Sequence, residues 1–555
     1  MLSGITGQHQ FSLNFFIMNR FLLSAIACSV SYGAFATAPA LNKVWDASAT
    51  LLSAADKVAY NSPVAVDADG NMIAAGNFDI NATFGDVALS ADDFESYIVK
   101  YDKTGVAKWA VSISLGATVK DITTDANGNI FVAGSFADEV TFGTTSGETI
   151  TKEGAKIDGD FTPSQNASFI AKYDADGALK QVATFVPEPL PALVETGMYY
   201  PMDGDVFFRI NHIEVSDNGV YASATYTGKT TVGNASFEGS YNDPWGGVYF
   251  VDLKSAAILK CDADLTDCSA VATYGVDTPL ATEDDQYQAG VATFGIKDNN
   301  VYATFSGNGP LTFSVGEYDE TTLDAESSSY KYLLVELSES GELGEMYPVD
   351  CPEAGLETSF TPAIVTFSGE NMLVAGSEPF AENYGTPEER LSNRLFVITA
   401  PLANFEAATT EAKEITEDKI NYNGIKSAAA LADGTIYLST LGYYSDVEGD
   451  NKKGDFAGTV KTFSFSAGEF APVAVAENAI GVAAAEDYVA FATENGVETK
   501  FSLFNTSDSA VDEILSDDAN APVEYFNLQG QRVANPSEGV FIRRQGSKAT
   551  KIMVK

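Results

Sequence analysis

The stretch Asp67-Ala-Asp-Gly-Asn-Met-Ile-Ala-Ala-Gly-Asn-Phe78 recurs 58 positions later as Asp125-Ala-Asn-Gly-Asn-Ile-Phe-Val-Ala-Gly-Ser-Phe136. Each copy begins with Asp, Gly and Asn, the residues that tight turns require, and continues as a short apolar run. This combination is typical of a turn followed by a β-strand. Because the two copies are separated by a fixed long period, they indicate a repeat architecture.

The repeat extends further along both copies. Thr83-Phe84-Gly85 returns as Thr141-Phe142-Gly143, and the run from Tyr97 to Asp102 returns 72 positions later as the run from Phe169 to Asp174. The second unit therefore holds an insertion of about 14 residues, which we expect between Ser146 and Ser164. No long stretch after residue 40 has apolar residues at helical spacing.

Weaker copies of the turn and strand follow, which gives roughly seven units, each long enough for one four-stranded blade. These copies begin near Ser216, Lys297, Ser368, Ala432 and Glu486. The sequence therefore predicts an all-β fold, a β-propeller of about seven four-stranded blades. Val44–Ser48 resembles Lys108–Ser112, the end of the first unit, so we expect it to complete the last blade and close the ring. An open solenoid is the alternative architecture.

A family resemblance rests on the markers of the first unit. These are Asp67, Gly70-Asn71, Gly76, Phe84-Gly85, Tyr97-Ile98-Val99-Lys100-Tyr101-Asp102, Gly105 and Trp109. The pattern resembles the bacterial β-propeller repeat known as the SBBP repeat. The resemblance implies an extracytoplasmic propeller, and it implies no catalytic residues, because the activity of this family is mostly unassigned.

The tail has a second resemblance. Tyr525–Val533, Gly539–Arg544 and Lys551–Lys555 predict three short strands. They are similar to the sorting domains of the type IX secretion route of Bacteroidetes, which implies export machinery as a partner. So few residues cannot bury a core of their own. We therefore divide the mature chain into a propeller (residues 41–507), an acidic linker (508–522) and a small C-terminal β module (523–555).

Residues 1–38 have the features of a signal peptide. Arg20 precedes the apolar run Phe21–Val30, and small residues suited to cleavage follow, with Met18 as an alternative start. We expect a secreted or outer-surface protein. The alternatives are the periplasm or a lipid anchor at Cys28. No later run is long and apolar enough for a transmembrane segment.

Charge and histidine content restrict the chemistry. The chain has 77 acidic and 32 basic residues and a formal net charge of −45, which excludes nucleic acid as a partner. Its two histidines are His9, within the signal segment, and His212. A multi-histidine metal site is therefore excluded, and we expect His212 to be a partly buried strand residue rather than a catalytic base.

Two candidate sites involve turns. Cys261 and Cys268 bracket an expected hairpin turn, and in an oxidising compartment they can form a disulfide. The oxygens of Asp67, Asp69 and Asn71 alternate as calcium ligands do. The competing interpretation is a turn that needs these residue types. Calcium is the one cofactor that the sequence suggests.

Non-repeating segments are the predicted location of ligand binding, because loops vary while blade strands are fixed by packing. Two inserts carry the aromatic residues Tyr199, Tyr200, Tyr241 and Trp245. We expect a binding or interaction protein with a glycan or protein ligand. The alternatives are a polysaccharide-degrading glycosidase or lyase that uses carboxylates, and a structural surface protein without a ligand.

Overall fold

The chain divides into two compact units, one spanning Lys43–Phe504 and the other Asn505–Lys555 together with Pro39–Asn42. The computed structural model describes residues 38–51, 62–92, 94–114, 116–154, 166–188, 206–233, 235–239, 254–275, 289–307, 311–315, 318–321, 331–338, 341–349, 361–382, 390–414, 420–444, 459–495, 498–506, 523–527, 531–537, 539–545 and 548–554. The signal segment, the acidic linker at 508–522 and the four insert aromatics lie outside these residues.

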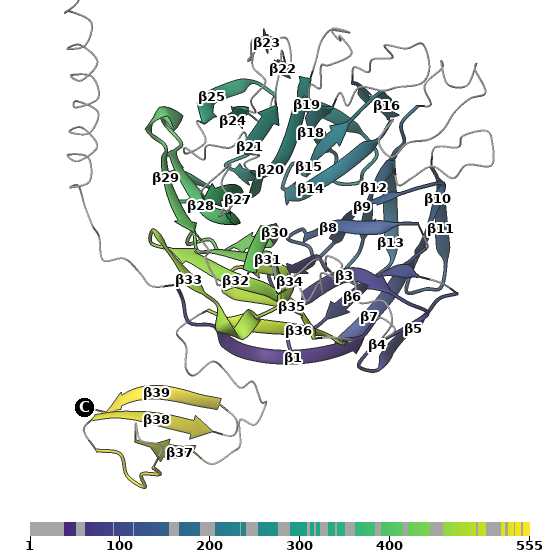
Figure 1. Cartoon of the computed structure of the whole chain (residues 1–555). Helices are drawn as coiled ribbons and strands as arrows, with labels where there is room; N and C mark the ends of the chain where they lie inside the picture. Colours follow the sequence, from purple (N-terminus) through teal and green to yellow (C-terminus); the bar gives the residue numbers. More distant parts are fainter. Residues whose placement is uncertain are drawn as a thin grey trace, which may run out of the picture. The chain divides into compact units, whose positions relative to one another are not determined.

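In the described part of the chain, the first unit holds seven blades around a common axis, each with four consecutive antiparallel strands (Figure 1). Three of these sheets are extended to six strands by an additional hairpin. The first three blades are β2 (Val64–Val66), β3 (Met72–Phe78), β6 (Glu95–Tyr101) and β7 (Ala107–Ile113); β8 (Thr118–Thr124), β9 (Ile130–Phe136), β12 (Ala167–Tyr173) and β13 (Leu179–Phe185); and β14 (Phe208–Ser216), β15 (Gly219–Tyr226), β18 (Ser255–Cys261) and β19 (Cys268–Gly275). The prediction of an all-β propeller is confirmed.

The remaining blades follow the same order. They are β20 (Ala289–Lys297), β21 (Asn300–Gly307), β24 (Lys331–Leu337) and β25 (Leu343–Val349); β26 (Thr361–Ser368), β27 (Asn371–Glu382), β28 (Arg390–Pro401) and β29 (Thr409–Glu414); β30 (Ile420–Ala430), β31 (Ile436–Tyr444), β32 (Thr459–Ser466) and β33 (Glu469–Pro472); and β34 (Ala479–Ala485), β35 (Tyr488–Asn495), β36 (Glu498–Asn505) and β1 (Asn42–Thr50). Two short 3-10 helices, η1 (Phe405–Ala407) and η2 (Ala474–Ala476), follow β28 and β33.

The N-terminal strand closes the ring. β1 lies beside β36 as the fourth strand of blade 7, and Asp46 accepts a hydrogen bond from the Ser502 hydroxyl at 2.8 Å and pairs with Lys500 at 3.1 Å. The first strand of each blade contacts the first strand of the next, through to the contact of β34 with β2. The ring is thus closed as expected, and the open solenoid is wrong.

Blades 1 to 4 each carry an additional hairpin between their second and third strands. The hairpins are β4–β5 (Asn81–Phe84, Val87–Ser90), β10–β11 (Glu139–Gly143, Thr149–Glu153), β16–β17 (Lys229–Val232, Ala235–Glu238) and β22–β23 (Thr312–Val315, Tyr318–Thr321). Three of them extend the sheet of the preceding blade beyond its outermost strand, since β4 pairs with β1, β10 with β7 and β22 with β19. The fourth lies beside β13, because Glu188 N donates to Lys229 O at 2.7 Å.

These hairpins explain the Thr-Phe-Gly marker and correct one boundary. The marker lies on the first hairpin strand of blades 1 and 2. The insertion of about 14 residues expected between Ser146 and Ser164 falls in two places. Asn81 pairs with Ser90 in blade 1 and Glu139 with Glu153 in blade 2, so the offset between the two units is 58 at the first hairpin strand and 63 at the second. Five additional residues therefore lie in the turn before Thr149, and the other nine follow Glu153.

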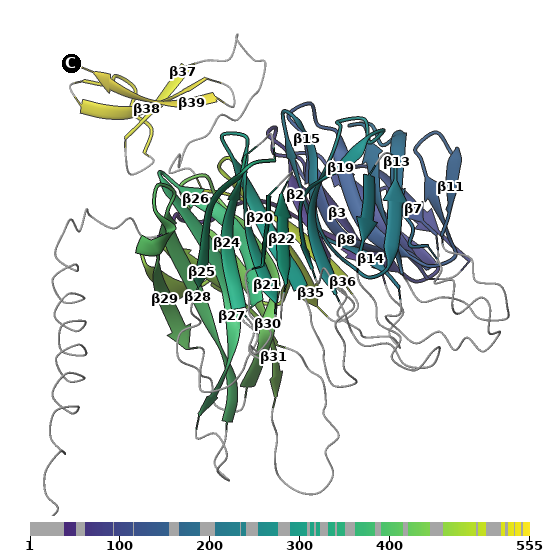
Figure 2. The ribbon, with the colours of Figure 1, turned by 90° about the horizontal axis from the view of Figure 1, so that it is seen from above.

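The two ends of the blades differ. One end, which we call the turn face, carries the tight turns such as Asp67–Asn71 and Asp102–Val106. The opposite end, the insert face, carries the four hairpins and the starts of the innermost strands, because each blade is an antiparallel sheet of consecutive strands (Figure 2). The described residues on either side of 189–205 and of 240–253 also lie at the insert face, because these two segments precede β14 and β18.

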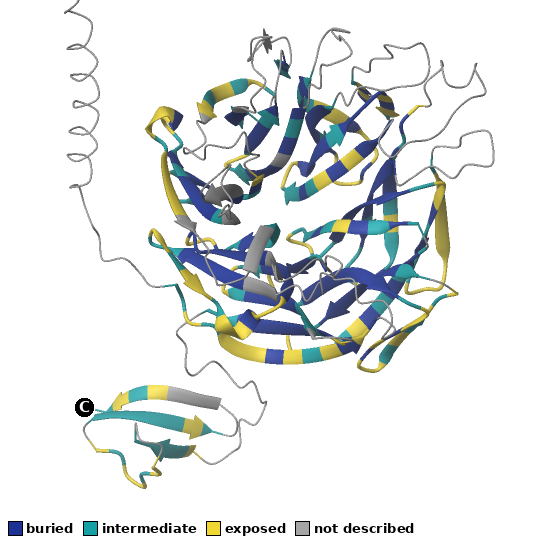
Figure 3. Cartoon of the chain, in the orientation of Figure 1, coloured by how far each residue is buried: buried dark blue, intermediate teal, exposed yellow. Residues whose placement is uncertain are grey.

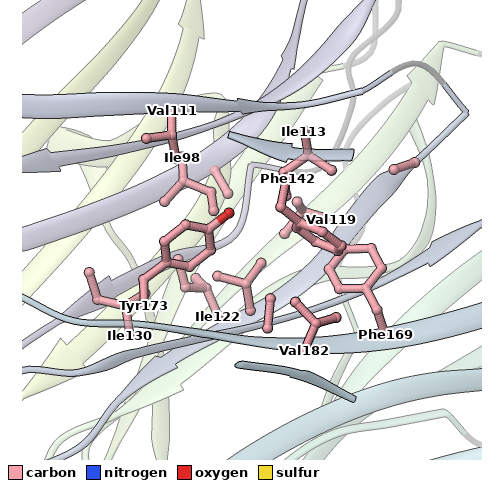
Figure 4. Packing of buried hydrophobic residues seen from close by; sticks show 14 of the residues in the cluster. Ile98, Val111, Ile113, Val119, Ile122, Ile130, Phe142, Phe169, Tyr173 and Val182 are labelled. Atoms are coloured by element: carbon pink, nitrogen blue, oxygen red, sulfur yellow. The ribbon is translucent and has the colours of Figure 1, made fainter. Parts of the chain in front are cut away.

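Apolar side chains are buried in layers between neighbouring blades (Figure 3). Between blades 1 and 2, Ile98 and Val111 face Ile130 and Tyr173 across such a layer (Figure 4). Flat sheet faces with β-branched and aromatic residues pack well in this way. The core is therefore distributed around the ring.

Two tryptophans fix neighbouring blades to each other. Trp109 on β7 is 8% exposed and lies against Gly177 in a turn of blade 2, and Trp45 on β1 is 7% exposed and lies against Gly105 in the equivalent turn of blade 1. Both glycines have positive φ, +81° and +85°. A side chain at either position would meet the indole ring, so the equivalent Trp and Gly positions of the repeat form one contact.

The second unit contains a three-stranded antiparallel sheet in the order β37 (Val523–Phe526), β38 (Gly539–Gln545) and β39 (Lys548–Val554). Its described residues are exposed or only partly buried. Arg532 pairs with Glu524 at 3.0 Å. No helix in the described residues of either unit is long and apolar enough to cross a membrane.

Candidate active site in the central channel

A cavity of about 440 Å³ lies on the axis of the propeller. The innermost strand of every blade contributes to its wall, through Val64–Val66, Ile122–Thr124, His212–Glu214, Phe294, Ala363–Thr366, Ala428–Ala430 and Val482–Ala485. Most of these side chains are small and apolar. Among the described lining residues the ionisable ones are His212, Glu214, Asp125 and Glu486.

One side of the channel, between blades 2 and 3, brings three ionisable residues together. The Oδ2 atom of Asp121 on β8 lies 2.7 Å from Nδ1 of His212 on β14 and accepts a hydrogen bond from Ile213 N at 2.8 Å. Glu214 lies two residues beyond His212. We call Asp121, His212 and Glu214 the channel cluster.

The imidazole of His212 is held between two neighbours. Asp121 binds its Nδ1, and the ring of Phe294 on β20 lies 5.1 Å away between centroids. The side chain is still 33% exposed although it lines the channel, and no second hydrogen-bond partner of the ring occurs among the described residues. The geometry therefore orients the ring through Nδ1 and leaves Nε2 available to a ligand.

The surroundings raise the pKa of both His212 and Glu214. Burial raises the pKa of Glu214 to about 7, although His212 and a hydrogen bond from Ile296 N act in the opposite direction. Burial alone would lower the pKa of His212, but the charge and hydrogen bond of Asp121, together with the charge of Glu214, raise it. The Oε2 atom of Glu214 is shielded from solvent and has no hydrogen-bond partner in the described structure. The cluster can thus hold or release a proton near pH 7.

A repeated backbone irregularity positions these side chains. In blades 2 to 7 the pairing of the first strand with the second is shifted by a β-bulge near the insert face. In blade 6 the shift is followed by Ser427, whose hydroxyl accepts from Val482 N of the next blade at 2.9 Å. Asp121 has the same role in blade 2. Its negative charge, which a serine hydroxyl lacks, allows it to bind the His212 imidazole as well.

The predicted calcium ligands form a self-contained turn. Asp67 is buried, and its carboxylate accepts from Asp69 N at 3.1 Å, from Asn71 N at 2.8 Å and from Asn71 Nδ2 at 2.8 Å, while Lys100 Nζ lies 3.6 Å away. Asp125 and Asn129 make the corresponding bonds in blade 2. Among the described residues, no group of three or more His, Cys, Asp or Glu side chains is arranged to hold a metal ion. Calcium binding at this turn stays a prediction.

The predicted cysteine pair lies at the end of a hairpin. Cys261 ends β18 and Cys268 begins β19, their Cα atoms are 4.0 Å apart, and their sulfurs are bonded at 1.99 Å. Both side chains are buried beside Leu265. This disulfide fixes a turn of blade 3 and has no contact with the channel lining in the described structure.

The sequence predicted His212 as a partly buried strand residue, which its place on β14 and its 33% exposure confirm, but it did not predict the partners of its ring. Asp121 lies 91 positions earlier, and no local pattern connects it with the histidine. The available signal was weak, namely a charged residue within a strand that also carries buried apolar side chains, as at Asp121 and Glu214. Tyr199, Tyr200, Tyr241 and Trp245 lie outside the described residues, so their role as ligand contacts stays a prediction.

Comparisons with known proteins give likenesses of fold alone. No protein-family model matches the chain, and no curated protein matches it. Solved structures that resemble it include an α-L-arabinanase of Penicillium chrysogenum (9% identity, 85% of this chain and 99% of that one, TM-score 0.31) and a streptogramin B lyase (11%, 70% and 93%, 0.25). A levansucrase variant of B. megaterium is similar at 11% identity, over 72% and 95%, with a TM-score of 0.26. At these values nothing about activity follows.

Proposed function

We propose that the protein is an exported β-propeller that binds a glycan or protein ligand in its central channel. The observation that carries the proposal is the channel cluster, which combines an oriented imidazole and a carboxyl group of raised pKa in a cavity that all seven blades line. A pocket with small apolar walls and a few convergent polar groups is the usual form of a ligand site.

Export and surface location are part of the proposal. They are supported by the signal-like segment at residues 1–38, by the resemblance to the SBBP repeat and by the resemblance of residues 523–555 to type IX sorting domains. An acidic, disulfide-containing chain fits an oxidising location outside the cytoplasm.

Binding can be tested by closing the channel. Ala363 on β26 and Ala484 on β34 line the cavity and are partly exposed. After a glycan and peptide array has identified a ligand, Ala363→Trp and Ala484→Trp should each abolish saturable binding. The matched control is Val106→Trp, since Val106 is 55% exposed on the turn face. Equal binding by the channel variants and the wild type would exclude the channel as the site.

The insert aromatics need a separate variant. Trp245→Ala should weaken binding if the insert at blade 3 contacts the ligand, as the sequence predicts. Retained binding in Trp245→Ala together with lost binding in Ala484→Trp would restrict the site to the channel.

An enzyme is the second candidate, and the specific observation that favours it is again the channel cluster. An Asp–His pair beside a carboxyl group with a pKa of about 7 is suited to general acid–base catalysis. Release of product from a polysaccharide panel, lost in Glu214→Gln, would establish this function. Binding without turnover over the whole panel would favour the binding protein.

A further inference from the structure

The cavity of the central channel opens at the turn face. Its lining includes Ala68, Ala126 and Glu486, which are exposed residues of the turns that follow the innermost strands. On the opposite side the lining begins at Ile122 and His212, inside β8 and β14. A ligand can therefore enter between the turns and reach His212 from there.

The turns around this opening are acidic. In every blade the turn between the first and second strands carries a carboxylate, half-buried at Asp125 in blade 2 and exposed in the other six blades. The exposed ones are Asp69, Asp217, Asp298, Glu370, Asp433 and Glu486. None of these seven turns, all of which are described, contains Lys or Arg. The opening therefore attracts positive charge.

The channel wall offers no Lys or Arg either. Among the described lining residues the ionisable ones are His212 and the carboxylates Glu214, Asp125 and Glu486, and most of the others are small and apolar. A ring of exposed carboxylates does not define a ligand site by itself, because a chain with a net charge of −45 has many of them. The specific evidence for a ligand comes from Glu214.

Glu214 has one carboxylate oxygen that the fold does not use. Ile296 N donates a hydrogen bond to the carboxylate, but its Oε2 atom is shielded from solvent and has no partner in the described structure. Such an acceptor costs free energy, which a donor from a ligand offsets. The terminal torsion of a Glu side chain is broad, so this oxygen can turn toward the channel. Because Glu214 lies two residues before the end of β14, it is about 7 Å below the turn.

We propose that the channel binds the side chain of a lysine from a basic protein partner, which enters from the turn face and brings its ammonium group to Glu214. This inference rests on the proposed function and selects a protein over a glycan as the ligand. The ammonium group supplies the donor that the Glu214 oxygen lacks. The aliphatic stem of the lysine lies against the small apolar wall, which includes Ala428 and Ala484.

The hydrogen bonding of Glu214 favours lysine over arginine. A guanidinium binds a carboxylate best through two parallel hydrogen bonds, which need both oxygens. Ile296 N already uses one of them. An ammonium group is a point charge that needs only the other oxygen.

The acidic turns favour a lysine within a protein over a free amine. Their exposed carboxylates, such as Asp217 and Glu370, are not among the residues that line the cavity. A small amine inside the cavity does not reach them, whereas basic residues that flank an inserted lysine do. Complementary charge of this kind increases the association rate and the specificity of a protein interface.

The test is titration calorimetry of the full mature chain at pH 8, above the pKa of Glu214 of about 7. The probes are the blocked peptide Arg-Gly-Lys-Gly-Arg, its analogues with norleucine or arginine in place of the lysine, and butylamine. Norleucine keeps an aliphatic side chain but has no amine. We expect the lysine peptide to bind, and the two analogues and butylamine to bind about tenfold more weakly or less.

Variants locate the contact. Glu214→Gln should weaken the lysine peptide about tenfold and leave the norleucine peptide unchanged, because the lost interaction needs both partners. Asp217→Asn should weaken both peptides equally, by about twofold, because it acts on the flanking arginines. The control is Glu411→Gln, at an exposed position of β29 on the outer edge of blade 5, which should bind as the wild type does. Circular dichroism checks that each variant is folded.

The outcomes separate this inference from the proposed function. A glycan that binds the wild type but not Ala484→Trp, with no binding of the lysine peptide, overturns the inference and keeps the channel as a binding site. Equal binding of the lysine and norleucine peptides, or equal losses in Glu214→Gln and Glu411→Gln, overturns the contact with Glu214. Butylamine binding as tight as that of the peptide overturns the protein partner. Absence of binding by any probe or array ligand overturns both proposals.

Discussion

The carboxylates of Asp67, in a tight turn, and of Glu214, in the channel wall, are both shielded from solvent, but they differ in their hydrogen bonding. Asp67 accepts hydrogen bonds from two backbone amides and one side-chain amide and faces a lysine, and the arrangement recurs at Asp125. Glu214 has one oxygen without a partner and occurs once. Carboxylates that recur and have their hydrogen bonds stabilise the turns of the blades. A carboxylate that occurs once and lacks a hydrogen-bond partner lowers the stability of the fold at its position.

The largest expected effect is at the satisfied carboxylate. Asp67→Ala should lower the free energy of unfolding by about 3 kcal/mol, because two amide N–H groups, Asn71 and the buried Lys100 all lose an acceptor. Denaturant unfolding measures the change. Asp69→Ala, at an exposed position of the same turn, should change stability by less than about 0.5 kcal/mol. Equal effects would mean that the turn is not held by its buried carboxylate.

A second prediction concerns the turns that join blades. Gly177→Ala should destabilise by about 2 kcal/mol, because its Cβ would lie 2.7 Å from Thr145 Cγ2 and 2.8 Å from Trp109 Cδ2 at a φ of +81°. Gly147→Ala is the control, since Gly147 has the same φ and open space around it. Gly147→Ala should lose only about 1 kcal/mol of stability, the cost of placing a side chain at a positive φ. If Gly177→Ala is no less stable than Gly147→Ala, the contact with Trp109 does not contribute to stability.

At the unsatisfied carboxylate we expect a gain that depends on pH. The pKa of Glu214 is raised in the folded state, so its contribution to stability is complete below about pH 4.5 and is lost as the pH rises through about 7. Gln does not ionise. Glu214→Gln should therefore be more stable than the wild type by about 1.5 kcal/mol at pH 8, a figure reduced because the side chain is only partly buried, and nearly equal at pH 5.

The measurement is the denaturation midpoint at the two pH values. Comparing the variant with the wild type at each pH cancels the effect of pH on the rest of the chain. A stability difference for Glu214→Gln that is the same at both pH values would contradict the raised pKa.

The smallest effect is spectroscopic. Because the charge and hydrogen bond of Asp121 raise the pKa of His212, Asp121→Asn should lower that pKa. His212 is the one histidine after the signal segment, so the mature chain gives a single imidazole signal in an NMR titration. Ser427→Ala removes the equivalent bridge in blade 6 and is the control. An unchanged titration in Asp121→Asn would show that the 2.7 Å contact has no electrostatic consequence.

Sequence reasoning succeeded where structure is set locally. The Asp-Gly-Asn turns and the closing strand near the N-terminus both follow from residues that lie close together or repeat at a fixed period. Tight turns restrict their residue types, so their composition is a direct signal.

The channel cluster could not be predicted in this way. Asp121 and His212 meet because two innermost strands lie side by side and a bulge shifts each of them, and neither the neighbour relation nor the bulge has a residue signature. The same holds for the hairpins. Thr-Phe-Gly was visible as a marker, but its pairing with the preceding blade depends on how the blades are arranged around the axis.

The position of β1 has a consequence for how this chain reaches its final state. The strand lies between β36 and the hairpin strand β4, and its hydrogen bond from Ser502 joins residues 456 positions apart. Contacts of such long sequence separation form late, since the whole intervening chain must first be ordered. β1 precedes the other described strands of the ring along the chain, yet it is among the last to find its partner, and until then both neighbouring strand edges stay open to other chains.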